Sequence, residues 1–259
     1  MTQSMTDLEL YPISASDVKE SFHEALSDFA SAPVSALFFA SIFVVFGLVI
    51  SNITWVTETT YWLILAILGF PLIGSVASVG FYEISRLRAA GEKPTVALAW
   101  RDAWSSRTGQ LPWLAVIIIV IFLFWFFLGH MIFALFLGLA PMRNVMSSLD
   151  VFTTPAGLQM LAFGTMIGGG FSVLVFGISV LGMPMIIDRE VDFVTAMVKS
   201  LQAVLNQPLI YLSWGAFIGL ATLISMLPFF LGLYVTMPLF GFMTWHIYRR
   251  ATTGAAPVT

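Results

Sequence analysis

The chain has 259 residues, of which 59% are hydrophobic and 10% charged, with a formal net charge of −3. Soluble globular domains carry about 45–50% apolar and about 25% charged residues, so too few polar side chains exist here to cover a water-facing surface. We therefore expect a multi-spanning integral membrane protein and exclude a soluble enzyme. The absence of cysteine excludes disulfides, thiolate metal sites and iron–sulfur clusters. The acidic balance gives no sign of a nucleic-acid partner.

The N-terminal region is polar and acidic. We expect residues 1–14 to form a disordered cytoplasmic tail, and we expect no cleavable signal peptide, because no basic region precedes an apolar one there. An amphipathic helix follows, with Ser14 or Ser16 as its N-cap. Its apolar stripe consists of Val18, Phe22, Leu26 and Phe29.

The long apolar stretches predict transmembrane helices. A helix needs roughly 20 apolar residues to cross a hydrocarbon core about 30 Å thick. The charge-free stretches are Pro33–Ser51, Tyr61–Phe81, Leu111–Ala140, Pro155–Ile187 and Pro208–Trp245. The last is long enough for two spans, with a turn expected near Pro228. We predict an all-α polytopic bundle of six spans, because backbone groups in lipid must bond internally.

A pattern of amphipathic segment, proline and apolar stretch recurs three times. The second and third segments have the stripes Val96, Trp100 and Trp104, and Val194, Met197, Leu201 and Val204. We predict three interfacial helices at the cytoplasmic leaflet, each followed by a span that opens at Pro33, Pro112 or Pro208. The chain then divides into a single membrane domain, 15–250, and a cytoplasmic tail, 251–259. Within the domain, either three hairpin repeats exist at 15–90, 94–189 and 190–250, or the prolines coincide by chance.

The middle hairpin is the longest. Its spans have about 30 residues each, or about 45 Å at 1.5 Å per residue, so they either tilt strongly or project beyond the outer surface. Thr153-Thr154-Pro155 predicts a helix start on that side. The run Gly168-Gly169-Gly170 either unwinds the fourth span or admits a close neighbour, and we favour close packing. The spacing of Gly164 with Gly168 and of Gly215 with Gly219 favours packing in the same way.

Lysine and arginine predict the orientation. Of the eleven such residues, only Arg143 lies on the side opposite to the others when six spans are assumed. Because basic residues concentrate on the cytoplasmic side, both termini are predicted to be cytoplasmic.

Few side chains in the spans can carry chemistry. The predicted spans contain no Asp, Glu, Lys or Arg, which argues against an ion-coupled transporter. His130 is either a haem or metal ligand, or a histidine bonded to a backbone carbonyl or water; we favour the second because no partner ligand accompanies it. Nucleophile–base pairs, phosphate-binding loops and dinucleotide motifs are lacking. We predict no catalytic residue, no metal and no cofactor.

Charged side chains gather at the cytoplasmic ends of the descending spans. The candidate docking or ion-pair cluster consists of Glu83, Arg86, Asp188, Arg189, Glu190 and Arg249. If the repeats surround a common axis, these ends would meet in an ion-pair network or form a docking surface. Snorkelling anchors at the lipid interface are the simpler interpretation, which we favour.

Two strings resemble a known bacterial family. They are Gly182–Asp192 and Thr244–Arg250. The family is a domain of unknown function described as a predicted integral membrane protein, and its members are often labelled as similar to cytochrome c oxidase subunit I. The resemblance implies a bacterial inner-membrane location and supplies no established activity. The three histidines of this chain are too few for the catalytic subunit of a haem–copper oxidase.

These observations predict a non-catalytic inner-membrane protein, acting as an accessory or assembly factor of a respiratory membrane complex or by self-association. The lipid bilayer is its expected surroundings, and the segment Asp188–Asp192 with the helix after it is the expected docking element. The alternative is a transporter or channel for a small uncharged or anionic solute, which the glycine and proline breaks favour. A lipid-modifying enzyme is a third and weaker alternative.

Overall fold

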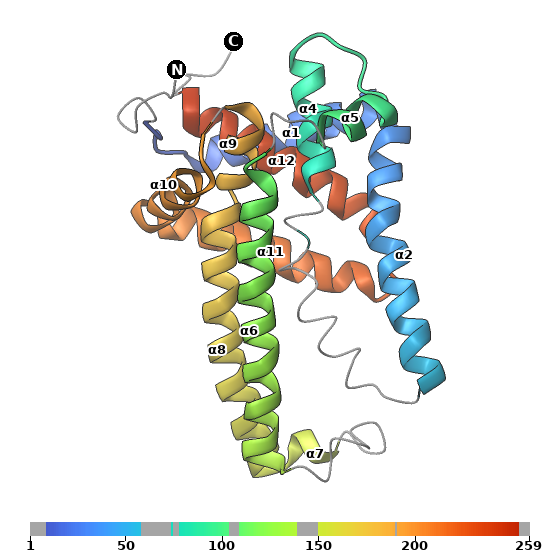
Figure 1. Cartoon of the computed structure of the whole chain (residues 1–259), viewed down its shortest axis with the longest axis vertical. Coiled ribbons are helices and arrows are strands. Elements are labelled where there is room, and N and C mark those ends of the chain that lie inside the picture. Colours follow the sequence, from blue (N-terminus) through green and yellow to red (C-terminus); the bar gives the residue numbers. More distant parts are fainter. Residues whose placement is uncertain are drawn as a thin grey trace.

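The computed structural model describes residues 9–57, 74, 78–103, 109–138, 150–189 and 191–253. Every regular element in those ranges is a helix, as the all-α prediction requires (Figure 1). The helices are α1 (Ala15–Ser31), α2 (Pro33–Thr57), α4 (Val79–Ala89), α5 (Val96–Ala103), α6 (Leu111–Leu137), α7 (Asp150–Thr153), α8 (Pro155–Ser179), α9 (Gly182–Asp188), α10 (Phe193–Asn206), α11 (Pro208–Met226) and α12 (Leu233–Thr253).

Four helical segments in the described residues are long and apolar enough to cross a membrane. They are Pro33–Ile53, Leu111–Leu137, Pro155–Asp188 and Pro208–Met226. They coincide with the first, third, fourth and fifth predicted spans, whereas most of the predicted span 61–81 lies outside the described residues. α12, the predicted sixth span, is not one of the four. Six spans and the threefold repeat therefore stay predictions.

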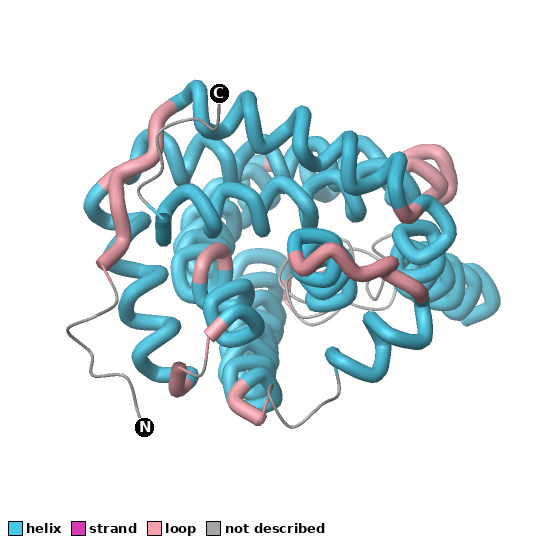
Figure 2. The backbone as a smooth tube through the Cα atoms, turned by 90° about the horizontal axis from the view of Figure 1, so that it is seen from above, coloured by secondary structure: helices cyan, strands magenta, loops and turns pink. Residues whose placement is uncertain are grey.

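The elements separate into long helices and a layer of short ones. α6 and α8 lie side by side as a long hairpin, α2 stands apart from them, and α11 and α12 run across their direction (Figure 1). Apart from α7, which lies at the opposite end, the shorter helices gather at the top of Figure 1, the end that faces the viewer in Figure 2. We call this end the helical layer; it comprises α1, α4, α5, α9, α10 and the C-terminal part of α12. α1 packs along α12 there, and α4 packs on α5, α9 and α12.

Side-chain caps and prolines set the helix starts. Ser14, one of the two predicted caps, accepts a hydrogen bond from the Asp17 backbone N–H (3.2 Å). The Asp17 carboxylate accepts one from the Ser14 backbone in return (2.7 Å), which completes a capping box. Thr154 starts α8 in the predicted position, bonding the Gly157 N–H at 3.0 Å. The prolines predicted to open spans lie in the first turns of α2, α6 and α11: Pro33, Pro112 and Pro208.

The amphipathic helices turn their polar side toward the protein. In α1, Phe22 and Leu26 are exposed, whereas Ser21 and Asp28 are buried. The sequence predicts an interfacial helix with an apolar stripe, and that prediction does not include the burial of Asp28 against other helices. In α10 the buried residues are Thr195, Ala196, Ser200 and Val204. Its exposed residues include the apolar Val194, Val198 and Leu205 as well as the polar Gln202 and Asn206. Apolar faces left outside are what a helix at a lipid interface presents.

The middle hairpin is continuous and closely packed at one glycine. α8 runs unbroken through Gly168-Gly169-Gly170, so this run does not unwind it. A Cβ added at Gly168 would lie 3.1 Å from Nε1 of the buried Trp125, while Gly169 and Gly170 face open space. Gly168 therefore allows α8 to pack closely on α6, as the favoured interpretation of the glycine run predicts. The His130 ring lies 2.8 Å from the Phe126 carbonyl oxygen, which agrees with the favoured interpretation of that histidine.

A buried hydroxyl bridges the break between α8 and α9. The Ser200 hydroxyl donates to the Gly177 carbonyl (2.6 Å) and accepts from the Leu181 N–H (3.1 Å). The break leaves backbone groups without their usual helical partners, and Ser200 supplies them from α10. This contact fixes α10 against the turn that leads into α9.

Residues 9–14 form what we call the N-terminal strap. Ile13 is buried, its N–H donates to the Gln207 side-chain oxygen (2.8 Å), and its carbonyl accepts from the Gln207 amide (3.0 Å). The Tyr11 N–H donates to the Ala251 carbonyl at 2.7 Å. This segment, expected to belong to a disordered tail, is therefore held against both α11 and α12.

Candidate functional site: a charged cluster and a hydroxyl-lined cavity

Asp28 is the centre of a buried charge cluster in the helical layer. It lies on α1 and is only 2% exposed. Its carboxylate accepts hydrogen bonds from Ser85 of α4 (2.5 Å) and His246 of α12 (2.8 Å), and it forms an ion pair with Arg88 of α4. A buried carboxylate is costly unless donors compensate its charge, and here three donors from two helices do so.

The imidazole of His246 lies between two acids of α1. Its Nε2 is 2.8 Å from Asp28 and its Nδ1 is 3.3 Å from Glu24. The sequence gives no indication of this contact. Asp28 is 218 residues away in the chain, so no local pattern indicated it.

These contacts determine the charge state of Asp28. Burial raises the pKa of this carboxyl, but hydrogen bonds from His246, Ser85 and Arg88 together with the charge of His246 outweigh it and hold the pKa below the ordinary value of 3.8. Asp28 is therefore ionised at neutral pH although it is buried. It is a structural anion that joins α1 to α4 and α12.

Arg250 fastens α12 to the acidic face of α1. Its guanidinium contacts Asp17 (3.4 Å), Glu20 (2.7 Å) and Glu24 (3.0 Å). Burial lowers the pKa of Arg250, but the charges of Glu24, Glu20 and Asp17 raise it further, so the net shift is upward. Successive acids are three and four residues apart and share one face of α1, which allows a single arginine to reach them all.

The predicted residues Glu83 and Arg86 form a second ion pair. Arg86 Nε is 2.6 Å from the buried Glu83 carboxylate, and Arg86 Nη2 is 2.9 Å from Asp102. Burial lowers the pKa of Arg86, but hydrogen bonds and charge from Glu83 and Asp102 raise it overall. This group joins α4 to α5, because Asp102 lies on α5.

The other predicted residues form a third group. Asp188 accepts a hydrogen bond from the Tyr248 hydroxyl (2.8 Å) and lies 3.4 Å from Arg249 and 3.8 Å from Arg189. Glu190 lies outside the described residues. The structure thus brings Asp188, Arg189 and Arg249 together, and Glu83 and Arg86 together, as two separate groups.

The ion pairs around Asp28, Arg86 and Asp188, which together we call the charged cluster, hold helices of the protein to one another. Its acids and bases come from α1, α4, α5, α9 and α12, and each group joins at least two of these helices. Among the described residues, no group of three or more histidines and acids is arranged to hold a metal ion. The arrangement positions helices, although some of its members, such as Arg249 (45% exposed) and Glu24 (44% exposed), also reach the surface.

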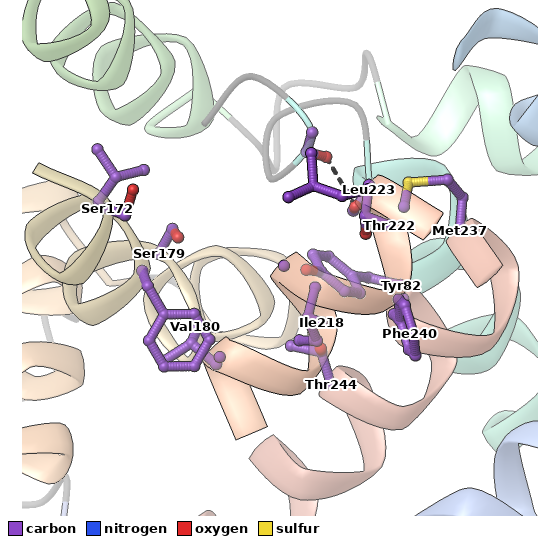
Figure 3. Close-up of a pocket in the computed structure, with 17 residues that line it drawn as sticks. Tyr82, Ser172, Ser179, Val180, Ile218, Thr222, Leu223, Met237, Phe240 and Thr244 are labelled. Carbon is purple, nitrogen blue, oxygen red and sulfur yellow. Dashed lines mark hydrogen bonds between the residues drawn. The ribbon is translucent and has the colours of Figure 1, made fainter. Parts of the chain in front are cut away.

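A cavity of about 300 Å³ lies between α4, α8, α11 and α12. None of its described lining residues is charged. Ser172 and Ser179 of α8 lie across it from Tyr82, Thr222 and Thr244 (Figure 3). Six of the lining side chains carry hydroxyls: Ser78, Tyr82, Ser172, Ser179, Thr222 and Thr244.

Thr222 gives the cavity its most distinctive polar atom. The side chain is 1% exposed, and its hydroxyl has no hydrogen-bond partner among the described residues. A buried polar group without a partner is uncommon in proteins. Sequence analysis did not find this cavity, because its hydroxyls are scattered over four helices. The only local signal was Gly215 and Gly219, which both line it and were assigned to helix packing.

The long apolar helices and the charge-free interior cavity define a multi-pass integral membrane protein. A family model described as a predicted integral membrane protein (DUF2189) matches residues 63–188, just under half of the chain. The matched range includes α4 through α9 and the first part of the string Gly182–Asp192. The description gives the family no cytochrome oxidase label, so the resemblance is to the family and not to that label. No curated protein and no solved structure matches the chain significantly.

Proposed function

We propose that the protein is a non-catalytic component of the bacterial inner membrane, which acts as an accessory or assembly factor of a respiratory membrane complex. The observation that carries this proposal is the α6–α8 hairpin. Large apolar side chains of α6 are exposed from Trp113 to Leu135, a length of about 33 Å at 1.5 Å per residue. Membrane helices associate through such surfaces by close packing, without any need for reactive groups.

The state of the charged cluster supports the same proposal. Its described side chains form ion pairs and hydrogen bonds with one another, so their role is to stabilise the fold. A partner protein would therefore be bound through the exposed apolar faces of the helices. Within the docking element expected at 188–206, only the exposed apolar face of α10 then remains for binding a partner. Asp188 holds Tyr248 and Arg249, and Asp192 caps α10 by accepting from the Thr195 N–H (2.9 Å). What α10 offers a partner is its exposed apolar face, which includes Val198 and Leu205.

The test is purification of the tagged protein from its native membrane in mild detergent, followed by mass spectrometry and a reduced-minus-oxidised visible spectrum. We expect stoichiometric respiratory subunits with haem absorption bands. A solitary, colourless protein would contradict the accessory function.

Variants on α10 test the docking element separately. Val198→Glu and Leu205→Glu should remove the co-purifying subunits, because each places a charge on the proposed contact face. The matched control is Leu26→Glu on α1, which is also exposed and apolar. Charge reversal of Asp188 is a poorer test, since it would also break the contacts to α12. If both α10 variants retained every partner, α10 would not be the docking element.

A second candidate function, transport of a small solute, is favoured by the cavity. Its walls come from α8 and α11, which are both candidate spans, and it contains the unpartnered Thr222 hydroxyl. Flux of small neutral solutes into proteoliposomes would support transport. Proteoliposomes no more permeable than protein-free vesicles would argue against it.

A further inference from the structure

We propose that the cavity between α4, α8, α11 and α12 binds a small neutral molecule with a planar ring and hydroxyl or carbonyl oxygens, taken up sideways from the bilayer. The inference rests on the cavity considered above for transport, but it does not require that the molecule be moved across the membrane.

The lining argues for a neutral ligand. An ion in an apolar interior needs a compensating charge, and none of the described lining residues supplies one. The polar groups present are side-chain hydroxyls. Those of Ser78 and Ser172 already donate to backbone carbonyls and can only accept from a ligand, whereas the Thr222 hydroxyl can donate as well as accept. A ligand carrying a carbonyl would receive a hydrogen bond from Thr222, and one carrying a hydroxyl could bond it in either direction.

Aromatic side chains and the cavity size argue for a ring. Tyr82, Phe176 and Phe240 all contribute to the wall. Aromatic rings stack or pack edge-to-face with another ring, which gives a flat ligand a defined orientation. The volume of about 300 Å³ lies at the lower end of the range for small-molecule pockets, so one or two rings fit and a larger ligand does not.

The route of entry follows from the exposed part of the lining. Ser172 on α8 is exposed, and a Cβ added at Gly219 on α11 would meet nothing within 4 Å. Both residues lie on candidate membrane spans. An opening between two such helices faces lipid, so a molecule dissolved in the bilayer can reach the hydroxyls without crossing water.

The binding experiment uses the purified full chain in nanodiscs, with menadione as the carbonyl probe and 1-naphthol as the hydroxyl probe. We expect saturable binding of both above the partition into protein-free discs. Thr222→Val should weaken binding roughly threefold to tenfold, because it removes one hydrogen bond while keeping the side-chain shape. The matched control is Thr252→Val, which alters another buried threonine that does not line the cavity and whose hydroxyl bonds the Tyr248 carbonyl.

A variant that fills the cavity with a larger side chain tests the binding site independently. Gly219→Leu should abolish binding of both probes, whereas Gly164→Leu should not, because Gly164 also faces open space but lies outside the lining. The anion 2-naphthoate should bind at least tenfold more weakly than 1-naphthol. Unsaturable uptake of the neutral probes, or equal affinities in wild type, Thr222→Val and Gly219→Leu, would overturn the inference. Saturable binding of the probes without solute flux would support the binding site and argue only against transport as the function.

A fold control separates binding from stability. Because the Thr222 hydroxyl has no partner among the described residues, Thr222→Val should leave the thermal midpoint of the ligand-free protein unchanged or raise it. A clear loss of stability would show that the hydroxyl bonds within the protein, and it would count against the inference.

Discussion

The carboxylate of Asp28 is nearly inaccessible, yet it is ionised because α4 and α12 supply its donors. In a soluble protein an acidic face of a surface helix would normally meet water. Here the face of α1 opposite Asp28 carries exposed apolar side chains, so the protein interior is the favourable place for the charge. The acids of α1 therefore face other helices of the protein, whereas Phe22 and Leu26 lie outside beside polar residues such as Lys19.

Removing this carboxylate should destabilise the protein strongly. Asp28→Ala leaves His246 and Arg88 without their shared anion, and breaking a buried pair of this kind costs roughly 3 kcal/mol. The measurement is the free energy of unfolding in mixed micelles. The matched control is Glu20→Ala on the same helix, because the Glu20 side chain is 44% exposed and Arg250 keeps two other acids. Its loss should stay below about 1 kcal/mol, and equal losses in the two variants would contradict the buried-anion account.

Low pH should destabilise the fold by protonating Asp28. The pKa of Asp28 in the folded protein lies below its ordinary value of 3.8, and the pKa of Asp17 is lowered as well. Stability from these groups is fully present above the unfolded value and is lost as the pH falls through the folded value. We expect the thermal midpoint in detergent to be constant near neutral pH and to fall below about pH 4. In Asp28→Asn the decline should be shallower, and an unchanged decline would exclude Asp28 as its source.

At the scale of elements, close approaches between helices are made by glycines. A Cβ added at Gly241 of α12 would lie 2.6 Å from the Cβ of Phe81 on α4, whose ring is fully buried. Gly241→Ala should therefore separate α12 from α4 and cost about 1–3 kcal/mol of unfolding free energy. The control Gly164→Ala faces open space on α8 and should be neutral or stabilising by up to about 1 kcal/mol. Similar losses in both would show that the Phe81 contact is not the cause.

The sequence predicted the local features of these elements better than their packing. Ser14, Thr154 and the prolines at the starts of α2 and α11 act where expected, since caps and proline effects depend on a few neighbouring residues. The turn near Pro228 was also predicted, and it lies between α11 and α12. Burial was less predictable, because in a membrane the exposed face of a helix is apolar and hydrophobicity no longer indicates the inside.

The candidate site was predicted only in part for a related reason. Charge density beside the spans indicated Glu83, Arg86, Asp188 and Arg249, which do form ion pairs. The partners Asp28 and His246 were missed because they meet through tertiary packing of the first and last helices. The hydroxyls of the cavity carry no periodic signal at all, so only a structure brings Ser179 and Thr222 to one place.

For the whole molecule, the number of spans is the main open prediction. Four candidate spans are found in the described residues, and α12 is not one of them. Because the chain has no cysteine, single cysteines can be introduced without removing native ones. Leu231→Cys, in the exposed turn after α11, should react with a membrane-impermeant maleimide from the periplasm. Glu92→Cys, in the exposed loop after α4, should react only after the inner membrane is opened.

The two cysteines give distinct outcomes. Labelling of Leu231→Cys from outside and Glu92→Cys from inside would support a hairpin of α11 and α12 that crosses the membrane with both termini cytoplasmic. Protection of Leu231→Cys until the inner membrane is opened would show that this hairpin does not cross, and the prediction of six spans would be wrong.

The pairing of α1 with α12 also constrains how the protein is made. A ribosome releases α1 well before α12, so Asp28 and the neighbouring acids are made long before His246 and Arg250 exist. During that interval the N-terminal strap also lacks its contact at Ala251. These contacts can therefore form only after α12 has been made. A product truncated before α12 would keep the contact of Asp28 with Arg88 but would leave Asp17, Glu20 and Glu24 without Arg250, a feature by which membrane quality control can distinguish it.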